Sequence, residues 1–165
     1  MPILDANTFE FFSRSPAQTR RVGMRLGAYL ERGDLVCLHG ELGSGKTTLM
    51  QGIASGWGSL DLVSSPSFVL VNVYRHLEGG ELFHLDAFRL RSAAEAMDLD
   101  LDNMLNRGPL VVEWPEHIRA ILPSEHLWIT LEWMNEEHRS LRFIPRAEHY
   151  ITLLQFLRQQ LYGVT

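Results

Sequence analysis

The stretch that decides the fold runs from Gly40 to Thr47 and reads Gly-Glu-Leu-Gly-Ser-Gly-Lys-Thr. It fits the pattern G-x-x-x-x-G-K-[ST], in which the backbone N–H groups of a glycine-rich loop surround a phosphate chain. An apolar run from Leu35 to Leu38 precedes it and predicts a buried strand. A helix is expected directly after it, over residues 47–53. The motif therefore has the strand–loop–helix setting that a phosphate-binding P-loop requires.

The loop and the first turn of the following helix are expected to bind a nucleotide. Lys46 is expected on the β- and γ-phosphates, and the Thr47 hydroxyl on a Mg²⁺ ion. No guanine-specific N-K-x-D sequence is present, which favours ATP over GTP. The residues expected to contact the nucleotide are Glu41, Leu42, Gly43, Ser44, Gly45, Lys46, Thr47 and Thr48.

Length and composition limit the possible classes of protein. A chain of 165 residues fits one domain, and 45% hydrophobic residues are enough for a core. The formal net charge of −5 argues against binding nucleic acid by bulk electrostatics. Cys37 is the single cysteine, so no internal disulfide is possible, and a buried, inert thiol is expected.

The sequence predicts a cytoplasmic protein without a membrane segment. The N-terminal residues lack the basic and apolar regions of a signal peptide. No apolar run approaches the roughly 18 residues that a membrane-spanning helix needs.

Helical and strand patterns alternate along the chain and predict a three-layer α/β fold of the P-loop NTPase type, with a mixed, mostly parallel central sheet. Ser15, Pro16 and Gln18 predict a helix start, and Gly33 is expected to end that helix. Gly56 and Gly58 are expected to end the helix after the P-loop. A capping box at residues 92–95 predicts one helix to about residue 105. Strands are expected at 8–12, 35–38, 68–74, 81–86, 109–113, 126–134 and 139–145, and further helices at 115–122 and 147–161.

Two carboxylates are candidates for the chemistry that a P-loop alone lacks. Hydrolysis needs a carboxylate on the metal and a group that places the nucleophile. Asp86 and Glu113 each end an apolar strand, and the ligand crevice of an α/β sheet lies at such strand ends. We expect both to converge on one Mg²⁺–phosphate centre. The alternative is that both are ordinary carboxylates that cap turns.

The loop Ser65-Pro66-Ser67-Phe68 follows the P-loop by some twenty residues. Its hydroxyls are placed to reach a γ-phosphate or the metal, as the switch loops of other nucleotide hydrolases do. A plain proline turn that enters a strand explains the same residues equally well. The seven histidines form no HExxH or Cys/His cluster, so no zinc site is predicted.

Four segments together resemble a known family, the TsaE (YjeE) family of bacterial P-loop ATPases. They are GELGSGKTT at 40–48, SPSF at 65–68, HLDAFRL at 84–90 and VEWPE at 112–116, in the family's order. The resemblance runs from about Thr19 to Pro123. It implies a mixed-sheet P-loop fold and a role in N6-threonylcarbamoyladenosine modification of tRNA. In that role the family binds the TsaB–TsaD pair and hydrolyses ATP.

The resemblance also implies roles for individual residues. Lys46 and Thr47 take the P-loop roles, Asp86 the metal role, and Glu113 the catalytic or water-ordering role. Ser67 stands where the family usually has threonine, so a hydroxyl remains for the switch contact. The tRNA would be reached only indirectly, through the TsaB–TsaD-like complex.

Two other functions stay open at this point. A small-molecule or nucleoside kinase would need an acceptor pocket and usually an arginine-bearing lid, and no lid-like arginine cluster is visible. A non-catalytic module that binds nucleotide without hydrolysing it is the other. No arginine finger in cis is recognisable either, so an ATPase is expected to depend on its partners for activity.

Overall fold

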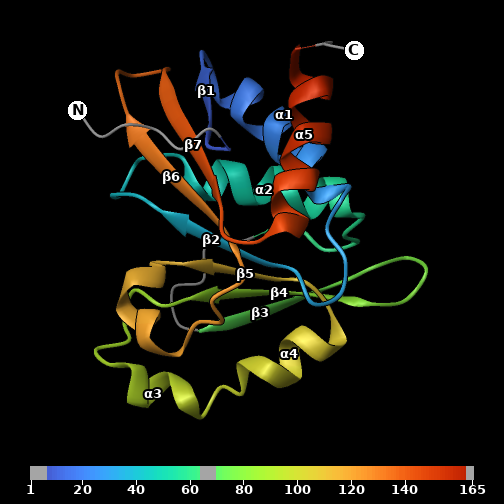
Figure 1. The fold of residues 1–165 in the computed structure, drawn as a ribbon, viewed down its shortest axis with the longest axis vertical. Coiled ribbons are helices and arrows are strands. Elements are labelled where there is room, and N and C mark those ends of the chain that lie inside the picture. Colours follow the sequence, from blue (N-terminus) through green and yellow to red (C-terminus); the bar gives the residue numbers. More distant parts are fainter. Residues whose placement is uncertain (1–6, 64–69, 163–165) are drawn as a thin grey trace.

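The computed structural model describes residues 7–63 and 70–162, in which seven strands form one sheet (Figure 1). The order across the sheet is β1-β7-β6-β2-β5-β4-β3. The P-loop strand β2 therefore lies at the centre, between β6 and β5. The strands are β1 (Phe9–Ser13), β2 (Leu35–His39), β3 (Val71–Arg75), β4 (Glu81–Asp86), β5 (Leu110–Glu113), β6 (Leu127–Trp133) and β7 (Arg139–Pro145).

The sheet is mixed, with a parallel centre. Strands β6, β2, β5 and β4 are parallel neighbours. Strand β7 is antiparallel to β6 and β1 is antiparallel to β7, so β1 points the same way as the central four. Strand β3 forms an antiparallel hairpin with β4. The predicted mixed, mostly parallel sheet is confirmed.

Helices cover both faces of the sheet. Figure 1 shows α1, α2 and α5 on one face, and α3 and α4 on the other. Each face has its own apolar core, one around Leu26, Leu49 and Leu157 and the other around Leu101, Met104 and Ile118. The predicted three layers are thus present. The helices are α1 (Pro16–Gly27), α2 (Lys46–Trp57), α3 (Ala93–Met97), α4 (Leu101–Arg107), the 3₁₀ helix η1 (Pro115–Ile121) and α5 (Glu148–Tyr162).

Three helix boundaries differ from the sequence prediction. Helix α1 ends at Gly27, before the predicted stop at Gly33. Gly56 lies inside α2, and Gly58 alone provides the left-handed cap, at φ 106°. The single helix predicted for residues 92–105 is wrong, because Asp100 adopts a left-handed conformation (φ 53°) that separates α3 from α4.

The predicted capping box at Ser92 does not form either. Ser92 makes no side-chain hydrogen bond to its helix, and the Glu95 carboxylate accepts a bond from the Arg91 backbone N–H. Asp100 instead caps the second helix, since its carboxylate accepts a bond from Asn103 N–H at 3.2 Å.

Glycines bring the backbones of α1 and α2 into close contact. A Cβ added to Gly52 would lie 2.9 Å from the Arg20 carbonyl carbon and nearer still to its oxygen. A Cβ at Gly23 would lie 2.9 Å from Ile53 N. The contact fixes the position of α2, whose first residue is Lys46.

Within the described residues, no helix has both the length and the apolar character needed to cross a membrane.

Candidate active site

A cleft of about 280 Å³ opens at the carboxyl ends of the central parallel strands. The strand order places the loop after β2 beside the ends of β4 and β5, which is where α/β sheets bind ligands. Most of the predicted nucleotide-binding residues line it, together with both predicted carboxylates. The lining residues are Leu42, Gly43, Gly45, Lys46, Thr47, Thr48, Asp86, Glu113, Trp114 and Arg139.

The P-loop depends on three glycines for its shape. Gly43 and Gly45 have left-handed backbones, with φ 80° and 106°. A Cβ on Gly40 would lie 2.6 Å from the Leu131 carbonyl oxygen. Ser44 is buried behind the loop and does not line the cleft, and its hydroxyl has no hydrogen-bond partner among the described residues.

Lys46 is buried and contacts the loop itself. Its ammonium group donates to the Gly40 carbonyl and to the Glu41 carbonyl, the latter at 2.9 Å. Glu41 thus takes part through its backbone and does not line the cleft. Burial lowers the pKa of Lys46, and nearby carboxylates, Glu113 first, oppose that change. An anionic ligand in the cleft would supply the charge that favours the ammonium form.

Asp86 and Glu113 lie side by side. They are partners in the parallel register of β4 and β5, so both lie at the carboxyl ends of neighbouring strands. Burial raises the pKa of Asp86, and the neighbouring Glu113 raises it further, whereas the Phe88 N–H, which donates to its Oδ1 at 3.0 Å, lowers it. A cation here would relieve the repulsion between the two carboxylates.

The oxygen donors fit a Mg²⁺ site completed by a ligand. The Thr47 hydroxyl and the carboxylates of Asp86 and Glu113 line the same cleft, and Mg²⁺ prefers oxygen ligands from one or two carboxylates plus phosphates. Within residues 7–63 and 70–162, no group of three or more His, Cys, Asp or Glu side chains is placed to hold a metal on its own. The assignment of Thr47, Asp86 and Glu113 to Mg²⁺ stays a prediction.

Glu113 has a buried partner that the sequence did not reveal. His84 Nε2 lies 2.5 Å from Glu113 Oε2, and the exposed fractions of the two side chains are 2% and 8%. On the other side of the imidazole, Nδ1 lies 3.0 Å from the Tyr74 hydroxyl. The only sequence signal was the position of His84 two residues before Asp86, which places both on one face of β4.

Arg139 is a second residue that sequence reasoning missed. It begins β7 and lines the cleft, and its Nε donates to the Gly43 carbonyl of the P-loop at 3.2 Å. Its Nη1 donates to the Asn135 carbonyl at 2.6 Å, in the turn between β6 and β7. Arg139 is therefore a second cationic group at the cleft, beside Lys46, and sequence reasoning did not anticipate it.

Trp114 forms an aromatic wall beside Lys46. It has a left-handed backbone (φ 56°), directly after the end of β5. Its ring lies 4.6 Å from the Lys46 ammonium, and the Phe88 and His117 rings pack against it at 4.9 and 5.7 Å. Aromatic rings therefore pack along one side of the cleft, next to Lys46.

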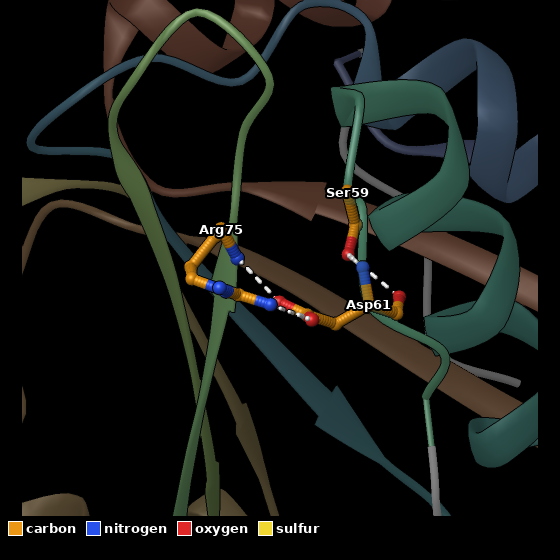
Figure 2. A network of polar contacts seen from close by, with 3 residues as sticks. All are labelled: Ser59, Asp61 and Arg75. Atoms are coloured by element: carbon orange, nitrogen blue, oxygen red, sulfur yellow. Dashed lines mark hydrogen bonds and ion pairs between the residues drawn. The ribbon is translucent and has the colours of Figure 1, made fainter.

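Ser67 lies outside the described residues, so its predicted role is untested by the geometry. The chain shortly before that loop is tied to β3, as Figure 2 shows. The Asp61 carboxylate accepts bonds from the Arg75 guanidinium at 2.8 Å and from the Arg75 backbone N–H at 2.9 Å. The Ser59 hydroxyl donates to the Asp61 carbonyl and accepts from its N–H, which closes a tight turn.

Known proteins resemble this chain in sequence and in fold. The family model described as "Threonylcarbamoyl adenosine biosynthesis protein TsaE" matches residues 13–141. The Streptomyces coelicolor protein named tRNA threonylcarbamoyladenosine biosynthesis protein TsaE is 48% identical over 115 residues, covering 68% of this chain and 78% of the relative. A Bacillus subtilis protein of the same name is 32% identical over 145 residues, covering 87% and 89%. The crystal structure of Bacillus subtilis YdiB superposes with a TM-score of 0.77 at 27% identity, covering 93% and 95% of the two chains.

Proposed function

The chain belongs to the TsaE family, and from its site we propose that it hydrolyses ATP as an accessory factor for N6-threonylcarbamoyladenosine modification of tRNA. One observation carries the proposal. The P-loop residues Lys46 and Thr47 share a single cleft with the strand-end carboxylates Asp86 and Glu113. A binding loop, a candidate metal ligand and a candidate water-ordering group are the parts that phosphoryl transfer to water requires.

Each residue has a distinct task in this proposal. Lys46 exchanges its bonds to the Gly40 and Glu41 carbonyls for bonds to phosphate oxygens. Thr47 and Asp86 hold Mg²⁺, which when bound neutralises charge on the phosphates. Glu113 orients the attacking water by accepting its proton in a hydrogen bond. Trp114 and Phe88 limit the access of bulk water to that side of the cleft.

We propose that a partner complex, and not this chain, binds the tRNA. The net charge of −5 is unfavourable for direct tRNA binding, because neutralisation of RNA phosphates supplies most of that affinity. Arg139 contacts the P-loop and the β6–β7 turn through backbone carbonyls, so we infer that it supports the loop. Full turnover then needs a TsaB–TsaD-like pair.

A phosphate-release assay tests the proposal. The purified protein with Mg²⁺ and ATP should be slow, and addition of the TsaB–TsaD pair should accelerate it. Lys46→Ala should abolish both rates, because it removes the ammonium group that is expected to bind the phosphates. Fast release that ignores the partners would favour an independent ATPase or a kinase. Tight nucleotide binding without phosphate release under any condition would favour a non-catalytic module.

A further inference from the structure

A hydrogen-bonded cluster of three buried polar side chains crosses three neighbouring strands and ends at the cleft. It runs from Tyr74 on β3 through His84 on β4 to Glu113 on β5. All three side chains are buried, with residue exposures of 3%, 1% and 6%. Burying a carboxylate beside an imidazole carries a desolvation cost. Apolar side chains at the same positions would fill the interior without that cost.

The hydrogen bonds of this cluster have one consistent direction when Glu113 is a carboxylate and His84 is a neutral imidazole. Carboxylate oxygens only accept, so His84 Nε2 must donate to Glu113 Oε2. In a neutral imidazole that proton leaves Nδ1 as an acceptor, and the Tyr74 hydroxyl then donates to it. The ring is thus held at both nitrogens, and its tautomer is defined.

Strand register explains why the pair reaches the site. Glu113 is the partner of Asp86, and His84 lies two residues before Asp86 on the same face of β4. The bond from His84 holds Oε2 of Glu113 and leaves Oε1 as the oxygen that His84 does not contact. A carboxylate with one oxygen fixed from behind has a defined orientation toward whatever occupies the cleft.

We propose that His84 is a positioning residue for Glu113, and that Tyr74 fixes the His84 ring in turn. The proposal rests on the proposed function, since it concerns how the carboxylate is aimed at the attacking water. It predicts a loss in kcat rather than in nucleotide affinity, because neither His84 nor Tyr74 lines the cleft.

The test compares four variants by partner-stimulated phosphate release and by the Kd of a non-hydrolysable ATP analogue. His84→Leu removes the donor and should lower kcat by about 10–100-fold, the usual cost of losing an orienting partner, with Kd nearly unchanged. His84→Gln keeps an N–H donor and should recover much of the rate. Tyr74→Phe removes one hydroxyl at constant shape and should give an intermediate kcat. His149→Leu is the control, because it removes another histidine–carboxylate pair, with Asp34, at the opposite end of the strands.

Each outcome decides between the possibilities. The positioning role is overturned if His84→Leu leaves kcat unchanged or lowers affinity and kcat equally. In both cases an active wild type leaves the proposed function intact. An inactive wild type with partners present would refute the proposed function instead. If His84→Leu does not fold, Tyr74→Phe decides by the same split of kcat and Kd. Proton NMR adds a readout that does not depend on activity: a protected downfield His84 Nε2–H signal is expected, and its absence would contradict the pair.

Discussion

Replacing Gly52 by alanine tests how tightly helix α2, and with it the P-loop, is held. Two effects of opposite sign compete at this position. In the middle of a helix, alanine is favoured over glycine by about 1 kcal/mol. The new Cβ, however, would lie 2.9 Å from the Arg20 carbonyl carbon, 0.5 Å inside ordinary contact at 3.4 Å, and nearer still to the oxygen. Both atoms are backbone, so no side-chain rotation relieves the overlap.

The steric overlap should outweigh the gain in helix propensity. Overpacking in a well-packed interior costs about 1–3 kcal/mol, and a rigid backbone neighbour favours the upper end. After the gain in helix propensity, we expect a net loss of about 2 kcal/mol in the free energy of unfolding. For a chain of this size that lowers Tm by about 4–8 °C.

Thermal unfolding followed by circular dichroism measures the effect. Ser55→Ala is the matched control, because Ser55 is an exposed residue of the same helix and alanine there should leave Tm unchanged or slightly higher. The Kd of an ATP analogue gives a second readout, since a shift of α2 moves Lys46. A Tm for Gly52→Ala at or above that of the wild type would refute the reasoning, because helix propensity would then outweigh the contact.

Three further predictions concern the cleft. Asp86 has a folded-state pKa above its ordinary value, so the unfolding free energy should fall as pH rises from about 3.8 through that pKa. Asp86→Asn should remove the contribution of Asp86 to this pH dependence and raise the Tm of the nucleotide-free protein at pH 7, which a pH series of melting curves checks. Glu113→Gln should retain ATP affinity by calorimetry and lose turnover by a factor of about 10²–10⁴, and wild-type turnover would contradict its role. Arg139→Gln should weaken ATP-analogue binding by about tenfold, because it removes a charged bond to the P-loop, whereas Arg142→Gln, which breaks an ion pair with Glu10, should not.

The sequence predicted the parts of the site that depend on local pattern. The P-loop is recognisable because its glycines, Lys46 and Thr47 must stand at fixed spacing. Strand β4 was expected to end at Asp86, and it does, because the apolar residues Leu82, Phe83 and Leu85 lead up to that carboxylate. The convergence of Asp86 and Glu113 followed from a general rule about strand ends in α/β sheets.

The missed contacts depend on distances that no local pattern contains. His84 meets Glu113 only because β4 and β5 pair in one particular register, and a slip by one residue would turn one side chain to the opposite face. Arg139 reaches Gly43 only because the turn after β6 brings the start of β7 over the P-loop. The break at Asp100 was also missed, since a left-handed aspartate is rare and the surrounding residues favour helix.

The central position of β2 has a consequence for the nascent chain. Its neighbours β5 and β6 are synthesised more than 70 residues later, so the strand before the P-loop has no partner when it leaves the ribosome. At about 5–20 residues per second, the interval between His39 and Trp133 lasts roughly 5–20 s. Until β5 has been synthesised, the apolar run from Leu35 to Leu38 has unpaired edges on both sides, and one edge stays unpaired until β6 follows; the run is a candidate site for chaperone binding or misassociation. A transcript truncated before β6 would encode an intact phosphate-binding motif on a strand that cannot complete its sheet.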